Sequence, residues 1–168
     1  GISRDRGWRI ERILLTHGHF DHTAAAEPLS RALNAPLSMH RLGAPFLADA
    51  ELNLSARCGR HVTIGARVDW LGDGDEVRLA ANPAFSIRVL YTPGHTPDSA
   101  TYYLPSESCA FVGDSIIGGG IGLTKFPGGD QPTLIRSLET RILALPQDTT
   151  LLSGHSGPIV VADFPARR

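Results

Sequence analysis

The chain has few cysteines, no long apolar run and no excess of basic charge. Only Cys58 and Cys109 occur among 168 residues, which excludes a disulfide-stabilised framework and a CxxC metal-binding knuckle. No apolar stretch approaches the roughly 20 residues that cross a bilayer, and the first residues lack the basic-then-apolar order of a signal peptide. We therefore expect reduced thiols, no membrane association and a cytoplasmic location.

The charge balance argues against a nucleic-acid partner. The formal net charge is -1 at pH 7, and the 16 lysines and arginines are dispersed along the chain. A protein that binds a nucleic-acid backbone usually carries a basic face. With 42% hydrophobic residues, the chain is predicted to form one globular domain over residues 1–168.

Short apolar runs alternate with helix-forming segments in the first third of the chain. Residues 10–16 and 35–39 are predicted as strands, and residues 23–33 and 42–56 as helices, the first capped by Asp21 or Thr23. The rest of the chain is predicted to contain strands at 68–71, 76–79, 86–91, 100–104 and 109–112, a Gly-rich loop at 118–129, a helix at 131–145 and a last strand at 150–152. This order predicts an α/β domain whose sheets are covered by helices.

The segment THGHFDH, residues 16–22, follows the first predicted strand and is the most informative part of the sequence. It places His17, His19, Asp21 and His22 in a single turn. Imidazole nitrogens and carboxylate oxygens are the ligands that zinc and similar ions favour. We therefore interpret the segment as a metal-binding turn rather than a solvated His-rich loop.

Three further polar residues end apolar runs beside glycines. They are His95 in TPGHTPDS, Asp114 in FVGDS and His155 in LLSGHSGP. Glycine lets the backbone bend sharply, so a side chain at a strand end can reach a common centre. Each residue alone would be interpreted as an ordinary turn residue. In combination with residues 16–22, they predict one shared metal site.

Taken in order, THGHFDH, TPGHTPDS, FVGDS and SGHSGP resemble the motifs of the metallo-β-lactamase superfamily, and in particular its glyoxalase II-like hydrolases. The similarity spans residues 13–158 and includes LTKFPGGD at residues 123–130. It implies an αββα sandwich, in which two sheets stack face to face and helices cover the outer sides. It also implies two divalent metal ions, with zinc expected first and iron or manganese as alternatives.

The resemblance assigns a role to each motif residue. The first metal would be held by His17, His19 and His95, and the second by Asp21, His22 and His155, with Asp114 bridging them. Asp21 and Asp114 would be the catalytic carboxylates, Asp21 by orienting a metal-bridging hydroxide that attacks a carbonyl. The resemblance also implies a small-molecule acyl or thioester substrate. If the substrate is a thioester, the leaving thiolate has a pKa of about 8.5 and hardly requires a general acid.

The chain departs from those relatives in three places. The HxHxDH loop begins after only fifteen residues, so the opening strands of the fold are expected to be missing, and the open sheet edge would favour self-association. Only thirteen residues follow His155, so the C-terminal helical domain of glyoxalase II is expected to be absent. Leu123 stands where many relatives have arginine, which leaves Lys125 as a candidate contact for a substrate carboxylate.

Other functions remain compatible with the same motifs. Lactones, β-lactams or phosphodiesters could be hydrolysed on the same metal core. The sulfur dioxygenases of the superfamily are similar at the first-metal histidines and Asp114 but use one iron. A third alternative is an inactive metal-binding module. His40 and His61 lie outside every motif, and we expect them at the surface or behind the ligands.

Overall fold

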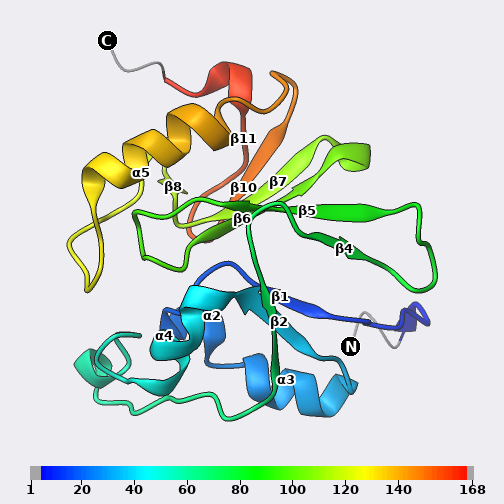
Figure 1. Cartoon of the computed structure of the whole chain (residues 1–168), viewed down its shortest axis with the longest axis vertical. Helices are drawn as coiled ribbons and strands as arrows, with labels where there is room; N and C mark the ends of the chain where they lie inside the picture. The colour runs from blue at the N-terminus through cyan, green and yellow to red at the C-terminus, as the bar shows by residue number, and fades with distance from the viewer. Residues whose placement is uncertain (1–4, 166–168) are drawn as a thin grey trace.

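The computed structural model describes residues 5–165, which form two stacked β-sheets with helices on their outer sides (Figure 1). Sheet A contains β1 (Ile13–Leu15), β2 (Leu37–His40) and β3 (Val68–Leu71), in that order. All three strands are parallel. Parallel neighbours require crossover connections, which pass over the outer face of the sheet and include the helical layer.

Sheet B is wider and has the strand order β11-β10-β7-β6-β5-β4. Its strands are β4 (Glu76–Arg78), β5 (Ser86–Tyr91), β6 (Ala100–Leu104), β7 (Cys109–Gly113), β10 (Thr150–Ser153) and β11 (Ile159–Val160). Strands β4 to β7 form an antiparallel meander, and β10 adds to β7 in parallel. The predicted Gly-rich loop contains β9 (Gly120–Ile121), which pairs with β8 (Ile116–Ile117) in a small hairpin.

The helices are short and interrupted. The α-helices are α2 (Phe20–Thr23), α3 (Ala26–Leu33), α4 (Ala44–Ala48) and α5 (Gln131–Ser137), and α5 continues as the π-helical turn η4 (Leu138–Ile142). Single 3₁₀ turns occur at η1 (Arg41–Gly43), η2 (Ala56–Cys58), η3 (Pro105–Glu107) and η5 (Val161–Asp163). In Figure 1, α3 and α4 cover the outer side of sheet A, and α5 covers sheet B. The predicted α/β class with four αββα layers is confirmed.

Two predicted helices are wrong in extent. The helix expected over residues 42–56 ends at Ala48, because Asp49 is extended (φ -126°) and its carboxylate accepts the amide of Glu51 at 2.7 Å. The helix expected over residues 23–33 is divided into α2 and α3. Asp21 lies inside α2, and neither Asp21 nor Thr23 caps a helix by its side chain. A local turn or cap of this kind competes with helix continuation.

Apolar side chains fill three layers of core. Leu15, Leu37 and Met39 pack between sheet A and its helices. The layer between the sheets includes Leu71, Val77, Val89, Ala100 and Tyr102, and the layer under α5 includes Val112, Leu134, Leu138, Ile142 and Leu151. Full burial of one such side chain contributes about 1.5–3 kcal/mol to folding. The two sheets are therefore fixed relative to each other by a continuous apolar layer.

Sheet A leaves part of sheet B uncovered. Within residues 5–165, β1 pairs with β2 alone, so its other edge is open. A cavity of about 290 Å³ lies beside that edge, lined by residues that include Leu14, Ile87, Leu104 and Phe111. Phe111 is 45% exposed. This open edge and exposed ring form the surface at which self-association is expected.

No helix in the described part of the chain is long and apolar enough to cross a bilayer. Cys58 is exposed, Cys109 is half-buried, and both are free thiols.

Candidate metal centre

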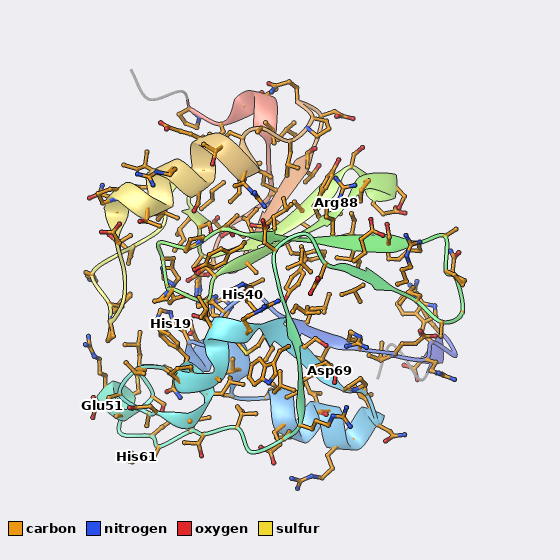
Figure 2. The ribbon with its side chains drawn as sticks, viewed as in Figure 1. His19, His40, Glu51, His61, Asp69 and Arg88 are labelled. Carbon is orange, nitrogen blue, oxygen red and sulfur yellow. The ribbon has the colours of Figure 1, made fainter. Side chains whose placement is uncertain are left out.

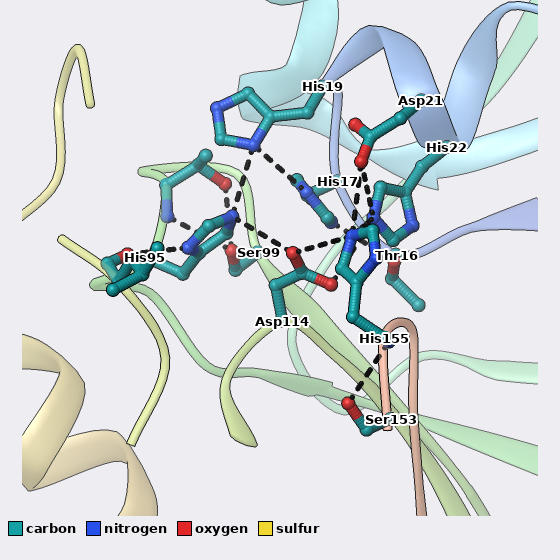
Figure 3. Close-up of polar contacts among 12 residues, drawn as sticks. Thr16, His17, His19, Asp21, His22, His95, Ser99, Asp114, Ser153 and His155 are labelled. Carbon is teal, nitrogen blue, oxygen red and sulfur yellow. Dashed lines mark hydrogen bonds and ion pairs between the residues drawn. The ribbon is translucent and has the colours of Figure 1, made fainter. Parts of the chain in front are cut away.

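Four loops meet at one edge of the sandwich and bring the seven predicted residues together (Figure 3). Strands β5, β7 and β10 run in the same direction in sheet B. The loops that follow them therefore leave the sheet at the same edge, and these loops carry His95, Asp114 and His155. The fourth loop follows β1, and the Ala100 amide fixes it by donating to the carbonyl of Thr16 at 2.9 Å.

The loop after β1 is held close to the helical layer on both sides of His19. A Cβ on Gly18 would lie 2.3 Å from the Cβ of Phe46, so only glycine allows this approach. The amide of Phe20 donates to the carbonyl of Asn53 at 2.9 Å. Helix α2 begins directly after His19, which places Asp21 and His22 on its single turn. These contacts fix the side chains of the motif relative to one another.

Three buried histidines form the first ligand group. The Nε2 atom of His17 lies 3.2 Å from Nδ1 of His19, and Nε2 of His95 lies 3.0 Å from the same Nδ1. The three rings are nearly perpendicular to one another, with interplanar angles of 82° to 89°. Each side chain is at most 3% exposed. Three ring nitrogens therefore converge on one point that water reaches poorly.

The tautomer of His95 follows from its other nitrogen. Its Nδ1 lies 2.6 Å from the carbonyl oxygen of Leu123, which can only accept, so Nδ1 carries the proton. In the neutral ring, Nε2 then presents a lone pair towards His19. A histidine that donates its far nitrogen to a carbonyl is the usual arrangement of a metal ligand. The donor set of this group therefore fits a divalent cation.

A second ligand group lies beside the first and is more exposed. The Nε2 atoms of His22 and His155 are 3.2 Å apart, and Oδ2 of Asp21 lies 3.0 Å from Nε2 of His155. Asp21 is 43% exposed and His155 46% exposed. A Cβ on Gly154 would lie 2.5 Å from Cε1 of His22, so the β10 loop also needs a glycine here. This group faces solvent, whereas the first group faces the interior.

Asp114 lies between the two groups. Its Oδ1 is 3.2 Å from Nε2 of His22, and its Oδ2 is 3.3 Å from Nε2 of His155 and 3.7 Å from Nε2 of His95. The side chain is only 7% exposed, and apart from the contact with His22 no hydrogen bond to Oδ1 is found among residues 5–165. A buried carboxylate with so few donors is costly unless a cation approaches it. Asp114 thus fits the bridging position that the resemblance implies.

The electrostatics keep the buried histidines neutral. Burial, reinforced by neighbouring imidazoles, lowers the pKa of His17 well below its usual value and that of His19 to about 4. Burial also lowers the pKa of His95, although the bond to Leu123 opposes it. At neutral pH these rings keep the lone pairs that metal binding requires.

In the pair of His22 and Asp114, the partner's charge outweighs the effect of burial on each pKa. Burial acts to lower the pKa of His22, but the hydrogen bond and charge of Asp114 raise it overall. Burial acts to raise the pKa of Asp114, but His22 and the other imidazoles lower it overall. The centre therefore combines an ionised carboxylate with neutral imidazoles on its inner side.

Lys125, the candidate substrate contact, lies at the edge of the first ligand group. The Phe126 ring packs against His19 with centroids 5.6 Å apart. The Nζ of Lys125 lies 5.6 Å from the centre of the Phe126 ring, and Cζ of Arg57 lies 6.0 Å from it. Both cationic side chains are exposed. Nothing in the sequence around Arg57 marks it as a partner of this ring, so the sequence analysis missed it.

The two histidines outside the motifs have different environments. His61 is exposed, as expected, and lies in a loop away from His19 (Figure 2). His40 is only 5% exposed and stacks on Tyr91 with ring centroids 4.3 Å apart, so of its two expected positions the surface is excluded. Neither belongs to the ligand groups found among residues 5–165.

Comparison with known proteins places this geometry in a family. The model of the metallo-beta-lactamase superfamily matches residues 2–155. The chain belongs to the metallo-beta-lactamase superfamily. The match includes all seven converging residues and both sheets up to the end of β10. The predicted resemblance and the fold that it implied are confirmed.

Two curated relatives are described as hydrolases. The probable metallo-hydrolase YqgX of Bacillus subtilis is 39% identical over 156 residues, which cover 92% of this chain and 72% of the relative. The hydroxyacylglutathione hydrolase GloC of Haemophilus influenzae is 34% identical over 148 residues, which cover 87% of this chain and 68% of the relative. The superfamily match thus extends to hydrolases of the glyoxalase II type at modest identity.

Solved structures of the superfamily superimpose closely on this chain. The BLEG-1 B3 metallo-beta-lactamase has a TM-score of 0.87 at 33% identity, covering 95% of this chain and 76% of its own. TTHA1623, crystallised in a di-iron-bound form, has a TM-score of 0.81 at 34% identity, with coverages of 96% and 77%. The similarity therefore includes a protein that holds two metal ions on this fold.

Proposed function

We propose that this chain is a binuclear metallohydrolase that cleaves thioesters in the manner of glyoxalase II. The observation that carries the proposal is the pair of adjacent ligand groups that share Asp114. His17, His19 and His95 would hold the first ion, and Asp21, His22 and His155 the second. Superfamily membership and the hydroxyacylglutathione hydrolase among the relatives support this assignment.

The donor set fits two divalent ions. Imidazole and carboxylate ligands suit zinc, and the same ligands accept iron or manganese. Bound at these groups, the two ions would supply a nucleophile from water at neutral pH and a Lewis acid for a carbonyl oxygen. Zinc is our first choice, and the di-iron form of TTHA1623 keeps iron as the alternative.

Asp21 is placed to act on the attacking water. Its carboxylate reaches the shared centre through Oδ2, yet the side chain is 43% exposed and borders the solvent side. A carboxylate in this position accepts a hydrogen bond from water and fixes the direction of attack. The buried Asp114 has no comparable access to solvent water. Its role would be to bridge the two ligand groups and fix the distance between them.

The substrate class follows from the leaving group and the edge of the site. A thiolate with a pKa of about 8.5 leaves without a dedicated acid. Lys125 and Arg57, both beside the Phe126 ring, would attract a carboxylate on the substrate, as a glutathione thioester provides. The free thiols of Cys58 and Cys109 are consistent with the reducing cytoplasm, where we place the reaction.

Metal content and turnover test the proposal together. We would determine metal per folded chain by elemental analysis and measure hydrolysis of a glutathione thioester before and after chelation. Two ions per chain and chelator-sensitive turnover are expected. Asp114→Asn should lose both, whereas His61→Ala, an exposed histidine outside the site, should keep both.

Other outcomes would assign the site differently. Two ions without thioester turnover would reject the thioesterase, and a panel of lactone, β-lactam and phosphodiester substrates would then identify another hydrolase or an inactive binding module. One iron per chain with oxygen consumption would contradict the binuclear hydrolase in favour of a dioxygenase. A chain that binds no metal would overturn the proposal entirely.

A further inference from the structure

Asp98 is a buried carboxylate that the metal centre does not use directly. It lies three residues after His95 in the loop between β5 and β6, and its side chain is 0% exposed. Neither of its oxygens has a hydrogen bond of normal geometry within residues 5–165. Its pKa is raised to about 6, mainly by burial. The environment thus disfavours the charge that this residue carries at neutral pH.

The carboxylate points into a space that two glycines leave open. Its Oδ2 lies 3.4 Å from the position that a Cβ on Gly18 would take and 3.1 Å from the position of a Cβ on Gly43. Gly18 is the residue between His17 and His19 in the metal loop. The backbone of Gly18 and the hydroxyl of Thr96 both favour the ionised form of the carboxyl and lower its pKa against the effect of burial. Asp98 therefore acts electrostatically on the backbone that joins two ligands.

The loop that carries Asp98 is itself rigid. The hydroxyls of Thr96 and Ser99 are 2.7 Å apart, and the Thr96 amide donates to the Ser99 hydroxyl at 3.2 Å. On the other side, the hydroxyl of Tyr91 donates to the carbonyl of Pro97 at 2.8 Å. The loop between β5 and β6 thus holds both His95 and Asp98 in place, and Asp98 lies beside Gly18 in the loop after β1. Asp98 therefore connects the two loops that supply the three histidines of the first group.

Packing does not explain the choice of this residue. A buried carboxylate without a close partner destabilises a fold, and a neutral side chain of the same size would fill the space better. Residues that destabilise the fold in this way are expected at functional sites, where the positions of the functional groups matter more than the free energy of unfolding. The ionised form of Asp98 offers an acceptor to the Gly18 amide, which a neutral apolar residue could not do.

We propose that Asp98 is a positioning residue, whose carboxylate orients the Gly18 peptide and so sets His17 and His19 for the first metal ion. The inference rests on the proposed metal site, and it is independent of the substrate. It makes an unusual prediction: removing the charge weakens metal binding but does not weaken the metal-free fold. A residue needed only for packing would affect both in the same direction.

Two substitutions separate these roles. Asp98→Ala removes both oxygens, whereas Asp98→Asn keeps the shape and one acceptor oxygen. Asp148→Asn, an exposed carboxylate beside Ser108, is the matched control. We would measure zinc affinity by competition with a chromophoric chelator, the visible spectrum of the cobalt-substituted protein as a readout of ligand geometry, and the Tm of each metal-free protein.

The expected result is a loss of about 10–100-fold in affinity for the tighter ion in Asp98→Ala, the range typical of residues that orient metal ligands. The cobalt spectrum should shift, and the metal-free Tm should stay equal or rise. Asp98→Asn should show a smaller loss, and Asp148→Asn none. Unchanged affinity in Asp98→Ala would overturn the proposal, and so would a metal-free Tm that falls together with affinity. Thioester turnover of the wild-type protein tests the proposed function separately, because its failure would leave these affinities as they are.

Discussion

His95 donates its Nδ1 proton to the carbonyl oxygen of Leu123 at 2.6 Å, and this bond leaves Nε2 free to face the first ligand group. The bond uses a main-chain atom of residue 123, whose side chain is 49% exposed. A leucine here therefore supports His95 as well as an arginine would. Leucine at residue 123 therefore affects the edge of the site but not the hydrogen bond that orients His95.

Metal binding should stabilise the protein, and His95 should be necessary for the full effect. Free zinc at about 100 times its dissociation constant would add about 2.7 kcal/mol to the free energy of unfolding. His95→Ala removes one of three converging nitrogens and should lose most of this gain. Calorimetry with zinc and with chelator would measure it, with His61→Ala as the control. An equal gain in His95→Ala would show that the first group does not bind the ion.

Gly94 should not tolerate a side chain. It adopts φ +131°, and a Cβ would lie 2.3 Å from backbone atoms of Leu134 at the start of α5. We expect Gly94→Ala to destabilise the fold by about 1–3 kcal/mol, the usual effect of overpacking, and to displace the adjacent His95. Urea denaturation would measure the first effect and metal affinity the second.

Gly65 offers the matched control, because a Cβ there would meet nothing within 4 Å. Gly65→Ala should change stability by less than about 0.5 kcal/mol. A Gly94→Ala protein as stable as the Gly65→Ala protein would mean that the loop can move away from Leu134.

The contribution of Asp98 to the stability of the metal-free protein should fall as pH rises through the titration of this carboxyl. Its pKa is raised from 3.8 to about 6 by burial, while Thr96 and the Gly18 backbone oppose the shift. Between these values Asp98 binds more protons in the folded state than in the unfolded state, so its contribution to stability is lost with rising pH. The shift corresponds to about 3 kcal/mol of destabilisation above pH 6, which is absent below about pH 4.

Asp98→Asn should remove this contribution. The buried histidines, whose lowered pKa values change stability in the opposite direction, are present in both proteins and cancel in the difference. Tyr91 and Tyr102 beside Asp98 stay neutral in this range because their pKa values are raised. Urea denaturation of both metal-free proteins from pH 4 to pH 7 would give the difference. Parallel curves for the two proteins would show that Asp98 does not titrate in this window.

We propose that the open edge of β1 and the exposed Phe111 ring mediate self-association. An unpaired strand edge beside an apolar face is a common site of aggregation or pairing. Sedimentation velocity should therefore show association that increases with concentration, and Phe111→Ser should reduce it. Leu29→Ser, at a residue 46% exposed on α3, is the matched control. A wild-type protein that stays monomeric at all concentrations would contradict the proposal.

The strands and the ligand types could be predicted from the sequence because both depend on local chemistry. Short β-type runs such as residues 86–91 and 100–104 encode strands directly, and these bounds were predicted as the structure has them. The helix at residues 42–56 was overestimated, since its end depends on the Asp49 turn. Propensity along a segment does not show where a side chain will compete with the helix for backbone amides.

The sequence by itself determined which residues can bind metal: three histidines and an aspartate at short spacing, followed by three glycine-flanked partners, have this chemistry whatever the fold. Only the tertiary structure decided how their atoms meet. His22 and His155 are 133 residues apart along the chain, yet their Nε2 atoms lie 3.2 Å apart. The burial of Asp98 against Gly18 and the tautomer of His95 were also decided by the tertiary structure. Both depend on loops that the two packed sheets bring together, and not on neighbours in the sequence.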